Sequence, residues 1–244
     1  LFANLASMVI LGFARWLIDL VWGIETFGQF SLSLQLVTFV STFLSQVAMV
    51  LFPSLRSVDA DEQKRLYTSI KRKLDLLLPI VFISYYPILW IASIWLPQYS
   101  QGLSILYLLL PLCVFDGKML ICSTTYFKVL RKEKQLLYLN IASAVVAISL
   151  GTLSLLFFHS PASVMASAVL AIVFRSLTAE IYIMNYFGTS FGRSSILLFV
   201  LSLLFLIMNG LFTQIQAFAA TIFLALCFYM LCLSANKHGQ HASH

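Results

Sequence analysis

Eight strongly apolar stretches, each long enough to cross a bilayer as a helix, divide this 244-residue chain. A hydrocarbon core about 30 Å thick needs roughly 20 apolar residues per helix. None of the stretches shows the alternation of polar and apolar residues that marks membrane β-strands. They run over residues 2–22, 28–52, 76–96, 103–127, 136–158, 163–187, 195–212 and 215–234. The sequence therefore predicts an all-α, polytopic membrane helix bundle with about eight transmembrane helices.

The composition excludes an ordinary water-soluble fold. Hydrophobic residues make up 61% of the chain and charged residues only 10%. Soluble domains carry about 25% charged residues, which cover a surface that faces water. A lipid bilayer is therefore expected to surround this protein.

Lysine and arginine residues outside the apolar stretches fall in alternate connections. Six lie within residues 53–75 and four within 128–135, and Arg193 and Lys237 add one each. The connections that carry none are 23–27, 97–102, 159–162 and 213–214. Basic connections stay in the cytoplasm, so we predict a multipass protein of the cell inner membrane with both termini cytoplasmic. The net charge of +6 is spread over these connections, which does not indicate nucleic-acid binding.

The longest polar segment, residues 54–75, has the pattern of a short amphipathic helix on the cytoplasmic surface. Its apolar residues recur at helical spacing, its acidic residues come early and its basic residues late, an order that suits the helix dipole. The apolar residues are Leu66, Tyr67, Ile70 and Leu74. A helix of this kind gains about 1 kcal/mol per Lys or Arg from anionic lipid. A solvated loop that only sets the orientation is the alternative.

Three cations lie inside the apolar stretches. Each ionisable group at bilayer depth costs roughly 2.5 to 3.5 kcal/mol on insertion scales, so such groups face protein or water and often mark a pathway. We predict that Arg15, Lys118 and Arg175 bind a phosphate-bearing substrate in a cationic cavity, because guanidinium and ammonium groups suit phosphate oxygens. The alternative is interhelical ion pairing, for example of Arg175 with Asp116, which would neutralise both charges and specify packing.

Two acidic residues are candidates for ion coupling. Asp116 lies near the middle of the fourth stretch, and a buried carboxylate there is able to carry protons or sodium ions. Asp19 stands four residues after Arg15, on the same helix face, where the two could pair within the helix. Structural pairing is the alternative for both acids.

Catalytic and metal-binding motifs are absent from the sequence. It has no P-loop, no H-E-x-x-H and no Cys/His metal spacing, and the predicted outer connections are too short to form a catalytic domain. The four cysteines lie within apolar stretches without a C-x-x-C spacing, which indicates reduced structural thiols. We expect no enzymatic activity, no cofactor and no bound metal.

Several short motifs follow one another along residues 1–187. The helix from Asn4 to Trp22 carries Arg15 at its middle, Glu25 follows in a short turn, and Gly28-Gln29-Phe30-Ser31 begins the next helix. Further on come Phe52-Pro53, Leu96-Pro97-Gln98-Tyr99, Pro111, Lys132-Glu133-Lys134 and Asn140. In this order the motifs resemble the C-terminal part of an oligosaccharide or polysaccharide flippase, in the superfamily that also holds multidrug exporters. One departure is Ala14, where the family often has Asp immediately before the arginine.

The resemblance implies two helical lobes that rock about a central cavity lined by the first two helices of each lobe. Residues 1–187 would be the second lobe, 188–234 two additional transmembrane helices, and 235–244 a disordered polar tail. Arg15 would face the cavity, and the partners would be a lipid-linked oligosaccharide and the missing N-terminal lobe. The implied function is outward flipping of that lipid during polysaccharide biosynthesis. A multidrug cation antiporter, a membrane-embedded enzyme of lipid-linked glycan assembly and a structural scaffold are the alternatives.

Overall fold

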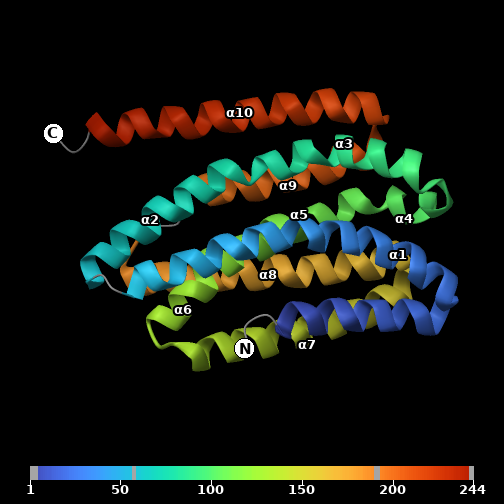
Figure 1. Cartoon of the computed structure of the whole chain (residues 1–244), viewed down its shortest axis with the longest axis horizontal. Coiled ribbons are helices and arrows are strands. Elements are labelled where there is room, and N and C mark those ends of the chain that lie inside the picture. The colour runs from blue at the N-terminus through green and yellow to red at the C-terminus, as the bar shows by residue number, and fades with distance from the viewer. Residues whose placement is uncertain (1–4, 57–58, 190–192, 242–244) are drawn as a thin grey trace.

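The computed structural model describes residues 5–56, 59–189 and 193–241, and every regular element within these ranges is a helix. The long helices run alongside one another (Figure 1). They are α1 (Leu5–Arg56), α2 (Ala60–Leu77), α3 (Pro79–Trp95), α4 (Ser100–Ser104), α5 (Leu106–Lys118), α6 (Thr125–Val129), α7 (Glu133–Phe158), α8 (Pro161–Phe187), α9 (Arg193–Leu211) and α10 (Gln214–His241), with a 3-10 turn η1 (Pro97–Tyr99) and a π-helical turn η2 (Met119–Thr124). Within the described ranges, seven segments are long and apolar enough to cross a membrane. The predicted all-α polytopic bundle is therefore confirmed.

Helix α1 is a hairpin of two antiparallel arms. Gly23 has φ of 83° and ψ of 177°, a conformation that glycine adopts without steric cost, and it breaks the helix. The first arm, residues 5–22, turns back at this point into the second arm, residues 24–56 (Figure 1). The first of the seven segments, Ala6–Thr42, therefore covers residues 6–22 of the first predicted span and 28–42 of the second.

The bundle has two distinct ends. The Gly23 break lies at the same end as the α3–α4, α7–α8 and α9–α10 connections (Figure 1), and we call this the turn end. The rings of Trp22 and His159, 5.8 Å apart between centroids, join two of these turns. The opposite end holds the start of α2 and the connection from α6 to α7, and we call it the basic end. The alternation of basic and non-basic connections is thus a real difference between the two ends.

The core is centred on α5 and α8. Most side chains of the segments Leu106–Val129 and Pro161–Phe187 are buried, whereas the outer helices bury a third or less of theirs. Small residues let α7 pack closely against α8 and the first arm. A Cβ atom at Gly151 would lie 3.2 Å from the Phe13 ring and 3.6 Å from the Ser167 hydroxyl, which is a tight fit. Position 151 thus has little room for a side chain.

The amphipathic helix predicted within residues 54–75 exists as α2, but its predicted place on the surface is wrong. Helix α2 leads directly into α3 through Leu78, and together they form one long rod (Figure 1). Its apolar side packs on the protein, where the Tyr67 ring lies 4.9 Å from Tyr126 and 5.5 Å from Phe187. Protein, and not lipid, therefore covers the apolar stripe. The sequence pattern could not distinguish an apolar stripe that packs against protein from one that faces lipid.

Helices α9 and α10 follow Gly188, which ends α8 in a left-handed conformation with φ of 61°. Helix α9 contacts α2, α3 and α5, whereas α10 lies at the edge of the bundle against α9 and α3 (Figure 1). Helix α10 continues to His241, so residues 235–241 of the expected disordered tail are helical. Residues 242–244 of that tail lie outside the described residues.

Gly102 offers a direct test of how the α1 hairpin docks on the bundle. Any Cβ atom there would overlap the backbone of Gln29, and the Gly102 carbonyl accepts a hydrogen bond of 2.6 Å from Ser33. Overpacking of this kind costs about 1–3 kcal/mol. We therefore expect Gly102→Ala to lower the thermal unfolding temperature of the detergent-solubilised protein by several degrees. Gly28→Ala is the matched control, because its Cβ would meet nothing within 4 Å; an equal loss in both variants would contradict this packing.

Candidate functional site

A polar cavity lies between the two arms of α1, α5 and α8, and we call it the hairpin cavity. Its volume is about 230 Å³. Both arms contribute to it, the first through Ser7 and the second through Thr38 and Thr42. The charged residues Asp116 and Arg175 also line it. A charged pair and several hydroxyl groups thus gather inside an otherwise apolar bundle.

Arg175 and Asp116 form an interhelical ion pair at this cavity. The Arg175 Nη2 group donates to a carboxylate oxygen of Asp116 and, at 2.7 Å, to the Ser7 hydroxyl. The Ser7 hydroxyl in turn donates to the same Asp116 oxygen at 2.8 Å. The pairing suggested as the alternative role of Arg175 is confirmed. Three elements, the first arm, α5 and α8, meet in this contact.

Arg15 has a different environment. It follows Met8 and Leu11 on one stripe of the first arm at helical spacing, and both of those residues line the hairpin cavity. Its side chain is half-buried, and its Nε atom is buried without a hydrogen-bond partner. Within the described residues it forms no ion pair, so the expected pair with Asp19 is not formed. Arg15 therefore has no carboxylate partner among the described residues.

Several polar side chains of the second arm are not covered by the bundle. Gln35, Thr42 and Gln46 are exposed and recur at intervals of seven and four residues, which places them on one side of the helix, together with the exposed Phe39. Asp19 on the first arm is exposed as well. Polar side chains at membrane depth face water or protein because contact with lipid is costly. The uncovered side of the hairpin is therefore mixed: polar side chains lie on it among exposed apolar ones such as Met8, Trp16 and Leu20.

Lys118 lies in a separate buried charge cluster, formed by Lys71, Asp75, Lys118, Glu180 and Ser195. The Lys118 ammonium is 2.7 Å from Asp75, 3.0 Å from Glu180 and 2.8 Å from the Ser195 hydroxyl. Lys71 lies 2.7 Å from Glu180. Two cations and two anions balance, and none of the four is more than 7% exposed. The cluster joins α2, α5, α8 and α9.

The three predicted cations are therefore not brought together in one cavity. Only Arg175 is among the residues that line the hairpin cavity. Ser7, which holds Arg175, precedes Arg15 by eight residues, a rise of about 12 Å along the helix. Lys118 belongs to the buried charge cluster. The prediction treated the three as equivalent because all lie in apolar stretches.

Sequence reasoning missed Lys71 and Asp75 as partners of Lys118. Both lie in the segment interpreted as a surface helix, where charges need no partner. A signal was present, because Tyr67, Lys71, Leu74 and Leu78 recur at helical spacing on one stripe. A lysine within an apolar stripe indicates a buried contact more than a solvated one. Extending that stripe into the next apolar stretch would have placed Asp75 inside the bundle.

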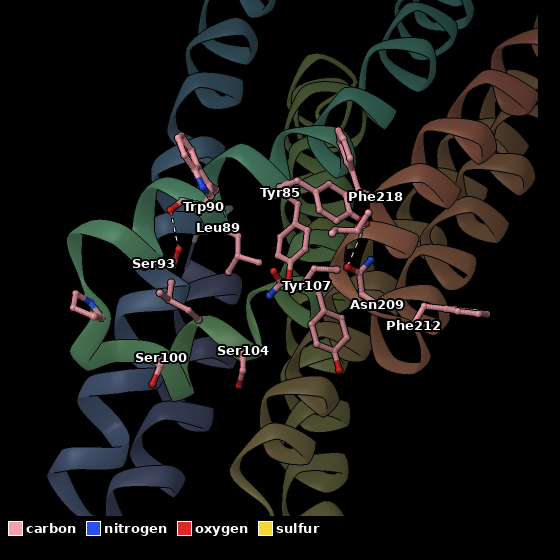
Figure 2. A pocket seen from close by; sticks show the side chains of 15 residues that line it. Tyr85, Leu89, Trp90, Ser93, Ser100, Ser104, Tyr107, Asn209, Phe212 and Phe218 are labelled. Carbon is pink, nitrogen blue, oxygen red and sulfur yellow. Dashed lines mark hydrogen bonds between the residues drawn. The ribbon is translucent and has the colours of Figure 1, made fainter.

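A second, larger cavity opens near the turn end between α3, α4, α9 and α10 (Figure 2). Its volume is about 620 Å³, and none of the described residues that line it is charged. Tyr85, Trp90, Tyr107 and Phe218 form much of its wall. The Tyr86 hydroxyl, at 3.3 Å from Asn209 and 2.8 Å from Thr221, ties α3 to α9 and α10 beside it. Its chemistry suits an uncharged amphiphile and not a phosphate.

Comparison with known proteins leaves the family open. No protein-family model matches this chain, and no curated protein matches it at a significant level.

The buried charge cluster predicts a large loss of stability when Lys118 is removed. Lys118→Met leaves two buried carboxylates sharing one cation, and breaking a buried pair in this way costs about 3–5 kcal/mol. We expect a thermal unfolding temperature well below that of the unaltered protein, measured in detergent by the fluorescence of the eluted monodisperse fraction. Lys134→Met, at an exposed position of α7, is the control. Similar unfolding temperatures for the two variants would show that the cluster does not stabilise the bundle.

Proposed function

We propose that this chain is one lobe of a two-lobed membrane flippase that moves a lipid-linked oligosaccharide across the inner membrane. The observation that carries the proposal is the group of exposed polar side chains on the α1 hairpin, Gln35, Thr42 and Asp19, together with Arg15, which forms no ion pair among the described residues. Polar side chains of this kind need water or a second protein surface against them. A water-filled path between two lobes would provide both. The resemblance of residues 1–187 to polysaccharide flippases supports the same arrangement.

In this proposal the basic end faces the cytoplasm and the turn end faces outward, as the distribution of Lys and Arg favours. Arg15 lies eight residues from Gly23, about 12 Å along the helix from the turn end. Its guanidinium would attract the pyrophosphate of the lipid carrier, since Arg offers several donors to phosphate oxygens. The glycan head group would pass along the polar side of the hairpin while the lipid tail stays in the bilayer. No covalent step is involved.

The other residues predicted to bind substrate or to couple ions have different roles in this proposal. Arg175 lines the hairpin cavity and is a second candidate for contact with phosphate. Lys118 is surrounded by two carboxylates and a hydroxyl, so we propose that it acts through stability and not through substrate contact. Asp19 is exposed on the hairpin, and Asp116 borders the cavity, which keeps both as candidates for ion coupling. A second lobe would complete the path.

A multidrug cation antiporter is the nearest rival, because the same hairpin also exposes Asp19. An antiporter for organic cations needs an acid at the substrate, whereas a carrier of diphosphates needs a cation. Arg15 and Asp19 therefore have opposite expected importance under the two hypotheses. Replacing each in turn distinguishes them.

Replacement of Arg15 tests the proposed function. In cells that produce the intact protein, we expect Arg15→Ala to reduce the outward appearance of lipid-linked glycan at least tenfold, because it removes the cation proposed to attract the pyrophosphate. Arg15→Lys should retain part of the transport, since it keeps the charge but not the planar donors. The readout is glycan accessible at the outer surface, normalised to the amount of protein in the membrane.

Asp19→Asn is the matched variant one turn away on the same helix face. We expect it to affect glycan appearance less than Arg15→Ala. The proposal would be contradicted by normal glycan export in Arg15→Ala at normal protein levels. Loss of export of an organic cation in Asp19→Asn, with glycan export intact, would support the antiporter instead.

A further inference from the structure

Arg175 has more donors than its protein partners use. The residue is only 2% exposed, yet its Nε and Nη1 atoms are buried without a hydrogen-bond partner. Only Nη2 is engaged, by Asp116 and Ser7. A buried donor without an acceptor is costly, and more so when it is charged. A partner that supplies oxygen atoms is therefore expected at this guanidinium.

The hairpin cavity provides the space for that partner. Its volume of about 230 Å³ is equal to the share of roughly seven water molecules in the liquid, at about 30 Å³ each. One phosphate group and a few waters fit such a space. The Thr38 and Thr42 hydroxyls in its lining donate to helix carbonyl oxygens and Ser7 donates to Asp116, so the Arg175 guanidinium is the donor group that the cavity offers to an oxyanion. Space and charge both suit a single phosphate group.

Asp116 already occupies one side of the guanidinium. It lines the same cavity, and its side chain is 19% exposed, in contrast to the 2% of Arg175. The carboxylate is therefore the more accessible member of the pair. A carboxylate and a phosphate compete for the same guanidinium donors. Asp116 has the position of an internal anion that a ligand could replace.

We infer that Arg175 is a binding site for one phosphate group and that Asp116 is its internal competitor, displaced when the ligand binds. The identity of the ligand as the substrate's own phosphate rests on the proposed function; the oxyanion site itself does not. No bond is made or broken in the exchange. The Arg175–Asp116 contact opens, and phosphate oxygens take the place of the carboxylate oxygen.

The exchange has a mechanical consequence for the hairpin. Ser7 is on the first arm, and its hydroxyl both receives a hydrogen bond from Arg175 and donates one to Asp116. Displacement of Asp116 therefore breaks one of the polar ties between the first arm and α5. The first arm would be held less firmly when ligand is present. Binding of phosphate at this site is thus linked to movement of the hairpin.

Anion binding to the purified intact protein in lipid nanodiscs tests the inference. Inorganic pyrophosphate and a short-chain prenyl diphosphate are titrated by calorimetry at fixed ionic strength. We expect Arg175→Gln to weaken binding at least tenfold, because it removes the cation. We expect Asp116→Asn to tighten binding about tenfold, because it removes the competitor while keeping an acceptor for Ser7. A purely structural ion pair predicts no gain of affinity in Asp116→Asn.

Ser7→Ala is the second variant, in case Asp116→Asn folds poorly. It leaves both charges in place but removes one hydrogen bond that holds Asp116, so a smaller tightening is expected. Lys134→Gln, at an exposed position of α7, is the control and should bind as the unaltered protein does. Binding that is unchanged or weaker in both Asp116→Asn and Ser7→Ala, in folded samples, would overturn the inference.

The two probes also separate the source of the phosphate. Tighter binding of the prenyl diphosphate than of pyrophosphate would identify a lipid headgroup, and equal binding would identify the free anion; both outcomes support an oxyanion site. The outcome is independent of glycan export. Absence of anion binding together with loss of export in Arg15→Ala would reject this site and leave the proposed function standing. Anion binding together with normal export in Arg15→Ala would support this site and reject the proposed function.

Discussion

Buried charge must be neutralised in a bundle with so little polar surface, and the balanced cluster around Lys118 meets this constraint where four helices join. Asp75 and Glu180 share Lys118 between them, and Lys71 supplies the second cation. The removal of any one partner would leave a charge in a medium that solvates it poorly. The cluster therefore connects α2, α5, α8 and α9 into a unit whose helices are not free to separate.

The α1 hairpin stands outside that unit and has the opposite character. Its contacts with the bundle include buried apolar side chains of both arms, close packing at Gly102 and the Ser7–Asp116–Arg175 contact, and its uncovered side carries polar residues among apolar ones. In the proposed function, a polar head group would pass along the exposed polar side chains of this hairpin. A phosphate at Arg175 that loosens Ser7 would connect the substrate to movement of the hairpin. The two features thus have separate roles, stability and transport.

Much of this architecture could be predicted from the sequence, because span length and the pattern of Lys and Arg depend on bilayer thickness and not on tertiary detail. The two arms of α1 and the existence of α2 follow from such local rules, whereas the Arg175–Asp116 pair was named only as an example of the alternative role for Arg175. The covering of α2 by protein did not follow, since an apolar stripe has the same pattern beneath lipid and beneath a helix. Lys71 and Asp75 were missed for the same reason. Which cations share a cavity depends on helix rotation, which spacing alone does not fix for Arg15, Lys118 and Arg175.

Water accessibility of the α1 hairpin distinguishes a polar path along it from a hairpin that faces only lipid or dry protein. Single cysteines are placed at Gln35, on the polar side of the second arm, and at Val145, on the exposed apolar side of α7 at a comparable distance from the turn end, in a variant whose four native cysteines are replaced. A membrane-impermeant maleimide, applied to the intact protein in membranes from either side, should label Gln35→Cys and leave Val145→Cys unlabelled. Equal absence of labelling at both positions would show that the hairpin faces lipid or dry protein, and the path along it would not exist.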